Sequence, residues 1–116
     1  MLDHERLDVY RCALELVALS THVIGQLPRG HATVADQLRR ASLSVPLNIA
    51  EACGKFTLSD RVTYFRTARG SALECAAAFD VIGLLGGGGA AVPKLQQGKQ
   101  LVERLVSMLT KLAKVV

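Results

Sequence analysis

The stretch QLRRASLSVPLNIAEACGK, residues 37–55, decides the fold class of this chain. Hydrophobic residues recur in it every three or four positions, the spacing of one buried face of a helix. That face begins just before the stretch and consists of Val34, Leu38, Ala41, Val45, Ile49 and Ala52. Pro46 stands in the middle and removes one backbone N–H, which frees the carbonyl of Ser42, so we expect a kinked helix that ends near Gly54.

Three further segments show the same helical spacing. One precedes the turn at residues 28–30, and another begins at Thr57 or Ser59 and ends at the glycine run 86–89. The last begins near Pro93, which suits the first turn of a helix. No segment shows the alternation of apolar and polar residues that is typical of a strand.

The four segments predict an all-α fold for a single domain over residues 1–116. Short connections place consecutive helices beside each other in opposite directions, so the expected architecture is an antiparallel up-and-down four-helix bundle, with helix two kinked at its proline. We expect the first helix to bury Leu7, Tyr10, Leu14, Val17, Ile24 and Leu27.

The first two helices carry a second apolar stripe beside the one assigned to the core. Half of the residues are hydrophobic before the 10 glycines are added, which is more apolar surface than a lone domain of this size hides. We therefore expect self-association through the second stripes. The expected interface residues are Val9, Ala13, Leu16, Leu43 and Leu47.

A polar stripe also runs along helix two, and helix three offers a matching surface in TARGSALE, residues 67–74. We predict a structural polar network between the two helices, since paired polar groups tolerate burial. Its members would be Arg40, Ser44, Asn48, Glu51, Arg69, Ser71 and Glu74. The alternative is that these residues simply face water, as charged helix stripes usually do.

The net charge of +4 is concentrated in the second half of the chain. Residues 61–116 carry eight Lys and Arg against three Asp and Glu, which permits an acidic partner such as RNA or a nucleoprotein. The candidate contacts surround the turn between helices two and three: Arg39, Lys55, Arg61, Arg66 and Arg69. Lys94, Lys99, Arg104, Lys111 and Lys114 form a second candidate strip on helix four. A basic face that serves only solubility remains the alternative.

The sequence indicates no enzymatic chemistry. The three histidines have no acidic partner at helical spacing, and neither Glu51 nor Glu74 precedes a histidine by three residues, as a di-metal bundle requires. The three cysteines are far apart and odd in number. We predict no catalytic residue, no metal, no cofactor and no small-molecule substrate. The charged N-terminal residues and the lack of a long apolar stretch predict a cytoplasmic protein without a membrane segment.

Three stretches resemble the four-helix-bundle family named for the 23S rRNA-intervening sequence protein: residues 7–17 (LDVYRCALELV), 37–55 and 64–74 (YFRTARGSALE). The match is residue by residue at Gln37 to Ala41, Ser44, Pro46, Asn48 to Glu51, Ala68, Gly70, Ser71 and Glu74, with Val45 and Ala52 as departures. The resemblance implies an all-helical homo-oligomer, with a homopentamer favoured, and RNA binding by analogy to a related retroelement accessory protein. The chain is thus expected to be a non-enzymatic homo-oligomer that binds RNA or a nucleoprotein, or alternatively a protein–protein interaction scaffold.

Overall fold

The computed structural model describes residues 2–86 and 92–114 of the chain. Its helices are α1 (Asp8–Gly25), α2 (Ala32–Cys53), α3 (Leu58–Leu84) and α4 (Val92–Leu112). Two short 3-10 helices, η1 (Asp3–Arg6) and η2 (Arg29–His31), precede α1 and α2. The described residues contain no strand, so the all-α fold with four helices is confirmed. None of these helices has the length and apolarity needed to span a membrane.

The starts of α3 and α4 and the end of α3 lie close to the positions predicted from capping, proline and glycine residues. The hydroxyl of Thr57 accepts a hydrogen bond of 3.2 Å from the backbone N–H of Asp60 and caps the start of α3. Pro93 is the second residue of α4. After α3, Gly86 has a φ of +69°, a conformation that favours glycine. The remaining residues of the predicted glycine turn, 87–89, lie outside the described residues.

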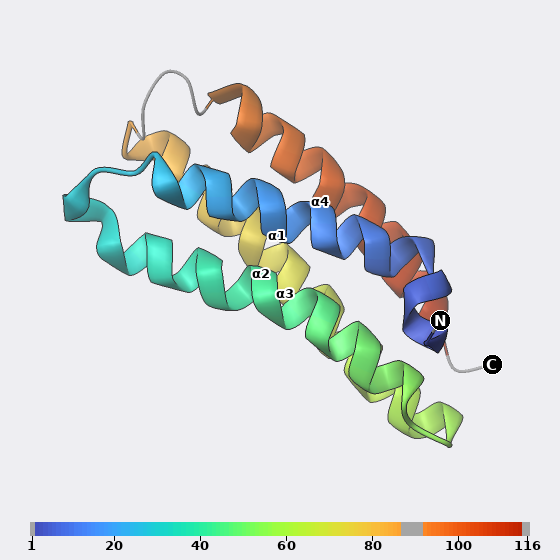
Figure 1. Cartoon of the computed structure of the whole chain (residues 1–116). Helices are drawn as coiled ribbons and strands as arrows, with labels where there is room; N and C mark the ends of the chain where they lie inside the picture. The colour runs from blue at the N-terminus through green and yellow to red at the C-terminus, as the bar shows by residue number, and fades with distance from the viewer. Residues whose placement is uncertain (1, 87–91, 115–116) are drawn as a thin grey trace.

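Each helix packs against two neighbours: α1 and α3 both contact α2 and α4 (Figure 1). The core lies in the middle of this arrangement and draws large, fully buried side chains from all four helices. Among them are Leu16 of α1, Leu38 and Ile49 of α2, Phe79 and Ile82 of α3, and Leu105 and Leu109 of α4. Because every helix contributes to one cluster, the burial of apolar surface holds the four together.

The core of α1 centres on the stripe that was predicted to face outward, and the stripe predicted to be buried lies mostly at its edge. Val9, Ala13 and Leu16 are only 3%, 0% and 0% exposed and belong to the core, whereas Leu14 is 46% exposed. The prediction that Val9, Ala13 and Leu16 face outward was therefore wrong. The physical reason is that α1 lies against both α2 and α4, so its buried face centres on the stripe between these two neighbours. Leu7, Tyr10, Ile24 and Leu27 pack at the edge of the core.

The predicted buried face of α2 is confirmed from Leu38 to Ala52, and Val34 is partly buried. Pro46 is buried within this helix, which is continuous from Ala32 to Cys53. One turn earlier, the hydroxyl of Ser42 donates a 3.1 Å hydrogen bond to the carbonyl oxygen of Arg39. Leu43 and Leu47 lie on the outside of α2 and are 45% and 66% exposed, as the sequence predicted.

Gly98 brings α4 close to α1 and α3. A Cβ at this position would lie 2.6 Å from Phe79 Cε2, closer than real Cβ contacts, and 3.0 Å from Leu19 Cδ2, which is tighter than most of them. The ring of Phe79 is itself 1% exposed and occupies the space that a larger residue would need. A larger residue at position 98 would therefore force the buried ring of Phe79 to shift.

Candidate functional site

A small polar contact joins α2 to α3 within the bundle. The hydroxyl of Ser71 donates a 2.8 Å hydrogen bond to Ser44 Oγ, which also accepts a 2.9 Å bond from Asn48 Nδ2. The same nitrogen lies 2.8 Å from the carbonyl oxygen of Ser44. Ser71 is buried, and Ser44 and Asn48 are partly buried, so these bonds satisfy polar groups that water reaches poorly.

The charged members of the predicted network lie elsewhere. Among the described residues, no hydrogen bond or ion pair joins them to the serine–asparagine contact. Glu51 is exposed and forms an ion pair of 3.8 Å with Lys55, and Arg69 Nε donates to Thr110 of α4 instead. Arg40 and Glu74 are exposed. The network is smaller than predicted because Arg40, Glu51 and Glu74 remain in water, where ionised groups avoid a desolvation cost, and Arg69 bonds to α4 instead.

Basic side chains converge on a cleft between α3 and α4, which we call the basic cleft. Its lining residues are Arg66, Arg69, Thr110, Ala113 and Lys114, and its volume is about 630 Å³. The 2.9 Å hydrogen bond from Arg69 Nε to Thr110 Oγ1 holds the guanidinium in place. No described carboxylate forms an ion pair with the three cations, so the cleft is positively charged.

The other three predicted nucleic-acid contacts do not line the basic cleft. Lys55 and Arg61 lie near the turn between α2 and α3, whereas Arg39 lies in the first half of α2, so the prediction that Arg39 clusters at this turn was wrong. Arg39 forms an ion pair of 2.8 Å with Asp36. Lys55 forms an ion pair with Glu51, and its Nζ also lies over the ring of Tyr64, 5.0 Å from the ring centroid. Arg61 Nε donates a 2.8 Å hydrogen bond to the carbonyl oxygen of Lys55. Carboxylates therefore pair with Arg39 and Lys55, whereas no described carboxylate pairs with the cations of the basic cleft, so the cleft is the better anion site.

Two lining residues of the basic cleft were not assigned to this site from the sequence. Thr110 is 41 positions from Arg69, and only the packing of α3 on α4 brings them together. Lys114 was expected in a separate strip on helix four. The spacing of basic residues along each helix was visible in the sequence, but the alignment of the two helices was not.

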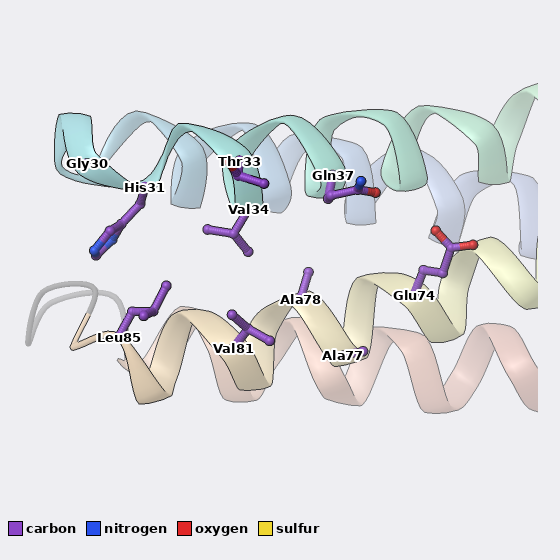
Figure 2. Close-up of a pocket in the computed structure, with 10 residues that line it drawn as sticks. All are labelled: Gly30, His31, Thr33, Val34, Gln37, Glu74, Ala77, Ala78, Val81 and Leu85. Carbon is purple, nitrogen blue, oxygen red and sulfur yellow. The ribbon is translucent and has the colours of Figure 1, made fainter.

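An apolar groove lies between the start of α2 and the second half of α3. It has a volume of about 520 Å³ and is lined by Gly30, His31, Thr33, Val34, Gln37, Glu74, Ala77, Ala78, Val81 and Leu85. Figure 2 shows Val34 pointing from α2 toward α3, while Ala78 and Val81 point back from α3. Glu74 and Gln37 lie at the same end of the groove. Sequence reasoning did not predict this groove.

The thiols of the chain are free and sit in apolar surroundings. Burial raises the pKa of Cys75 to about 12, and it also raises the pKa of Cys12 and of Cys53. Cys12 and Cys75 are also buried, so these two thiols stay protonated at neutral pH and are poor nucleophiles and poor metal ligands. Within residues 2–86 and 92–114, no group of three or more His, Cys, Asp or Glu side chains could hold a metal ion.

The histidines lie in three separate places. His4 packs edge-on against Tyr10 with ring centroids 4.8 Å apart, His22 is exposed on α1, and His31 lines the apolar groove. No two of them share a site, so the described residues bring no pair of histidines together for acid–base chemistry.

These features define an all-α protein of four helices with a hydroxyl–amide contact between α2 and α3 and a basic cleft between α3 and α4. Residues 5–111 match the family model of the 23S rRNA-intervening sequence protein, and the chain belongs to this family. The resemblance of residues 7–17, 37–55 and 64–74 is thereby confirmed. The family's description refers to an intervening sequence of 23S rRNA and names no catalysed reaction. No curated protein matches the chain.

Proposed function

We propose that this chain is a non-enzymatic, homo-oligomeric module that binds RNA through the basic cleft. The observation that carries the proposal is the convergence of Arg66 and Arg69 of α3 with Lys114, which follows the end of α4, on one cleft that contains no described carboxylate partner. Three cations at one place suit a phosphate backbone, because each neutralised phosphate releases condensed counterions.

The composition of the cleft supports recognition of the backbone rather than of the bases. Its lining contains no aromatic side chain, and the whole chain has only three Phe and two Tyr, so few rings are available for base stacking. The bound Arg69 can present its two terminal nitrogens to a phosphate, which matches the fork geometry that arginine uses for oxyanions. Binding should thus depend weakly on sequence and strongly on salt.

Self-association is the second part of the proposal. Leu43 and Leu47 of α2 and Leu73 of α3 are exposed, and such side chains favour burial against another protein surface. We propose a homo-oligomer of antiparallel up-and-down bundles, each with α2 bent at Pro46. The resemblance to the family favours a homopentamer. A closed ring would present several basic clefts to one RNA, which raises the apparent affinity.

A mobility-shift or filter-binding titration with structured RNA tests the first part. The wild-type protein should bind at about 50 mM salt and lose roughly 20- to 40-fold in affinity by about 200 mM, if each chain neutralises three phosphates. The Arg66→Glu/Arg69→Glu variant should lose binding at both salt concentrations. Arg39→Glu provides the matched control, because Arg39 is already paired with Asp36 and lies outside the cleft. No binding by the wild-type protein at the lower salt concentration would refute RNA binding.

A protein–protein interaction scaffold is the alternative, and the exposed leucines of α2 and α3 favour it. In that case the wild-type protein would assemble but would not bind RNA at either salt concentration, and the Arg66→Glu/Arg69→Glu variant would keep its oligomeric state. The RNA titration therefore separates the two functions, and light scattering after size exclusion tests the self-association that both require.

A further inference from the structure

We infer that the apolar groove receives Leu43 and Leu47 of a second copy of this chain. The inference rests on the proposed self-association and deepens it, because it names the two surfaces that meet. We call the pair Leu43 and Leu47 the leucine ridge. The ridge and the groove are different parts of the same molecule, so one copy would offer its ridge while its neighbour offers its groove.

The leucine ridge is a pair of exposed leucines that project from one face of α2. Leu43 and Leu47 are four residues apart on α2, so they lie on the same face, separated by about 6 Å along the helix axis. They are 45% and 66% exposed, and full burial of such side chains gains free energy. Arg40 lies one turn before Leu43 on the same face and is exposed.

The groove has the matching length and surface. From Glu74 to Val81 it follows α3 for seven residues, about 10 Å along the axis, which leaves room for two leucines. Its floor is made of small or branched side chains, because Ala77 and Ala78 leave space between Val34 and Val81. Figure 2 shows the carboxylate of Glu74 at the end of this floor.

The spacing of charges fixes the direction in which the two surfaces meet. On α2, Arg40 precedes Leu43 by three residues and Leu47 by seven; on α3, Glu74 precedes Ala77 by three and Val81 by seven. When α2 of one copy lies along α3 of the next in the same direction, Arg40 faces Glu74 while both leucines face the groove floor. In the opposite direction, Glu51 would instead approach Glu74, and like charges repel.

A contact between two unlike surfaces has a consequence that a self-complementary contact lacks. A substitution in the ridge or in the groove prevents copies of that variant from associating with one another. A variant with an altered ridge still has an intact groove, however, and this groove can receive the intact ridge of a variant whose groove is altered. Leu47→Glu removes the ridge and Ala77→Glu blocks the groove. Both residues are exposed, so neither change should disturb the helices, and each variant should keep the circular dichroism spectrum of the wild-type protein. Leu14→Glu on α1 changes another exposed leucine, which lies outside both surfaces, and serves as the control.

Light scattering after size exclusion gives the decisive result. We expect the wild-type protein and Leu14→Glu to assemble, and Leu47→Glu and Ala77→Glu each to elute near the monomer mass of 12.4 kDa. An equimolar mixture of these two variants should form a species of twice that mass. Assembly of either variant alone, or a mixture that stays monomeric, would overturn the pairing of ridge with groove while leaving self-association intact. A monomeric wild-type protein would refute self-association itself.

Charge exchange provides an independent test of the direction. Arg40→Glu and Glu74→Arg should each weaken assembly, with a dissociation constant raised several-fold, and the double variant should recover it. Both positions are exposed in the single chain, so neither change should alter the melting temperature of the monomer by much. If the loss of association free energy in the double variant equals the sum of the losses in the two single variants, Arg40 does not face Glu74 and the proposed direction is wrong.

Discussion

At the scale of single residues, Ser44 has the most connected role in the described polar contacts. Its hydroxyl accepts hydrogen bonds from both Ser71 and Asn48, so one oxygen links α2 to α3 and also ties the side chain of Asn48 to its own helix. This contact explains why α2 carries polar residues beside its buried apolar face. The polar stripe divides into a partly buried part that bonds to α3 and a charged part that stays in water.

Ser44→Ala removes the shared acceptor and leaves the hydroxyl of buried Ser71 without its partner. We expect a loss of about 1–3 kcal/mol in the free energy of unfolding, the usual cost of leaving a buried polar group unsatisfied. Chemical denaturation followed by circular dichroism measures it. Ser107→Ala, at an exposed position of α4, should change stability by less than about 0.5 kcal/mol. Equal effects of the two changes would show that the contact between α2 and α3 contributes nothing.

The buried thiol of Cys75 makes stability fall at alkaline pH. Burial raises its pKa from the ordinary 9.0 to about 12 in the folded chain. The unfolded chain therefore loses this proton first, and stability declines as pH rises from about 9 toward 12. Below pH 9 the contribution is fully present. Denaturation curves across this range should show a shallower decline for Cys75→Ala than for the wild-type protein; parallel declines would contradict this.

At the scale of secondary structure elements, the close packing of α4 on α1 and α3 depends on Gly98. Alanine favours a helix over glycine by about 1 kcal/mol, so propensity alone predicts that Gly98→Ala stabilises the protein. The 2.6 Å approach of its Cβ to the buried ring of Phe79 predicts the opposite. Overpacking of a core typically costs about 1–3 kcal/mol, so the steric effect should win.

Thermal unfolding of two glycine variants tests this balance. Gly98→Ala should lower the melting temperature, whereas Gly70→Ala should leave it unchanged or raise it. Gly70 lies inside α3, and nothing is within 4 Å of an added Cβ there. A higher melting temperature for Gly98→Ala would mean that the ring of Phe79 moves aside at little cost.

The helices also show how far the sequence determines the fold. The buried face of α2 could be predicted because its apolar residues form one clear stripe beside polar neighbours. On α1 two adjacent stripes are similarly apolar, and hydrophobic periodicity alone cannot say which one faces the core. That choice depends on α1 having neighbours on both sides, which is a property of the assembled bundle. Arg66 and Arg69 could be proposed from charge spacing, but Thr110 and Lys114 join them only through the alignment of α3 with α4.

At the scale of the whole molecule, assembly and RNA binding should be coupled through avidity. The Leu47→Glu variant keeps its basic cleft, so a short oligonucleotide that fills a single cleft should bind it as well as it binds the wild-type protein. A long RNA that spans several clefts should bind the variant at least about 100-fold more weakly. Fluorescence anisotropy with the two RNA lengths measures both affinities. Equal losses for both lengths would place Leu47 in the RNA contact itself and refute the coupling.

The uneven burial of the three cysteines offers an optical route to these measurements. The chain contains no tryptophan, so its own fluorescence is weak. Cys12 and Cys75 are enclosed in the core, whereas Cys53 is partly exposed at the end of α2. A maleimide dye should therefore attach to Cys53 first and give the native sequence a single reporter, without any engineered labelling site.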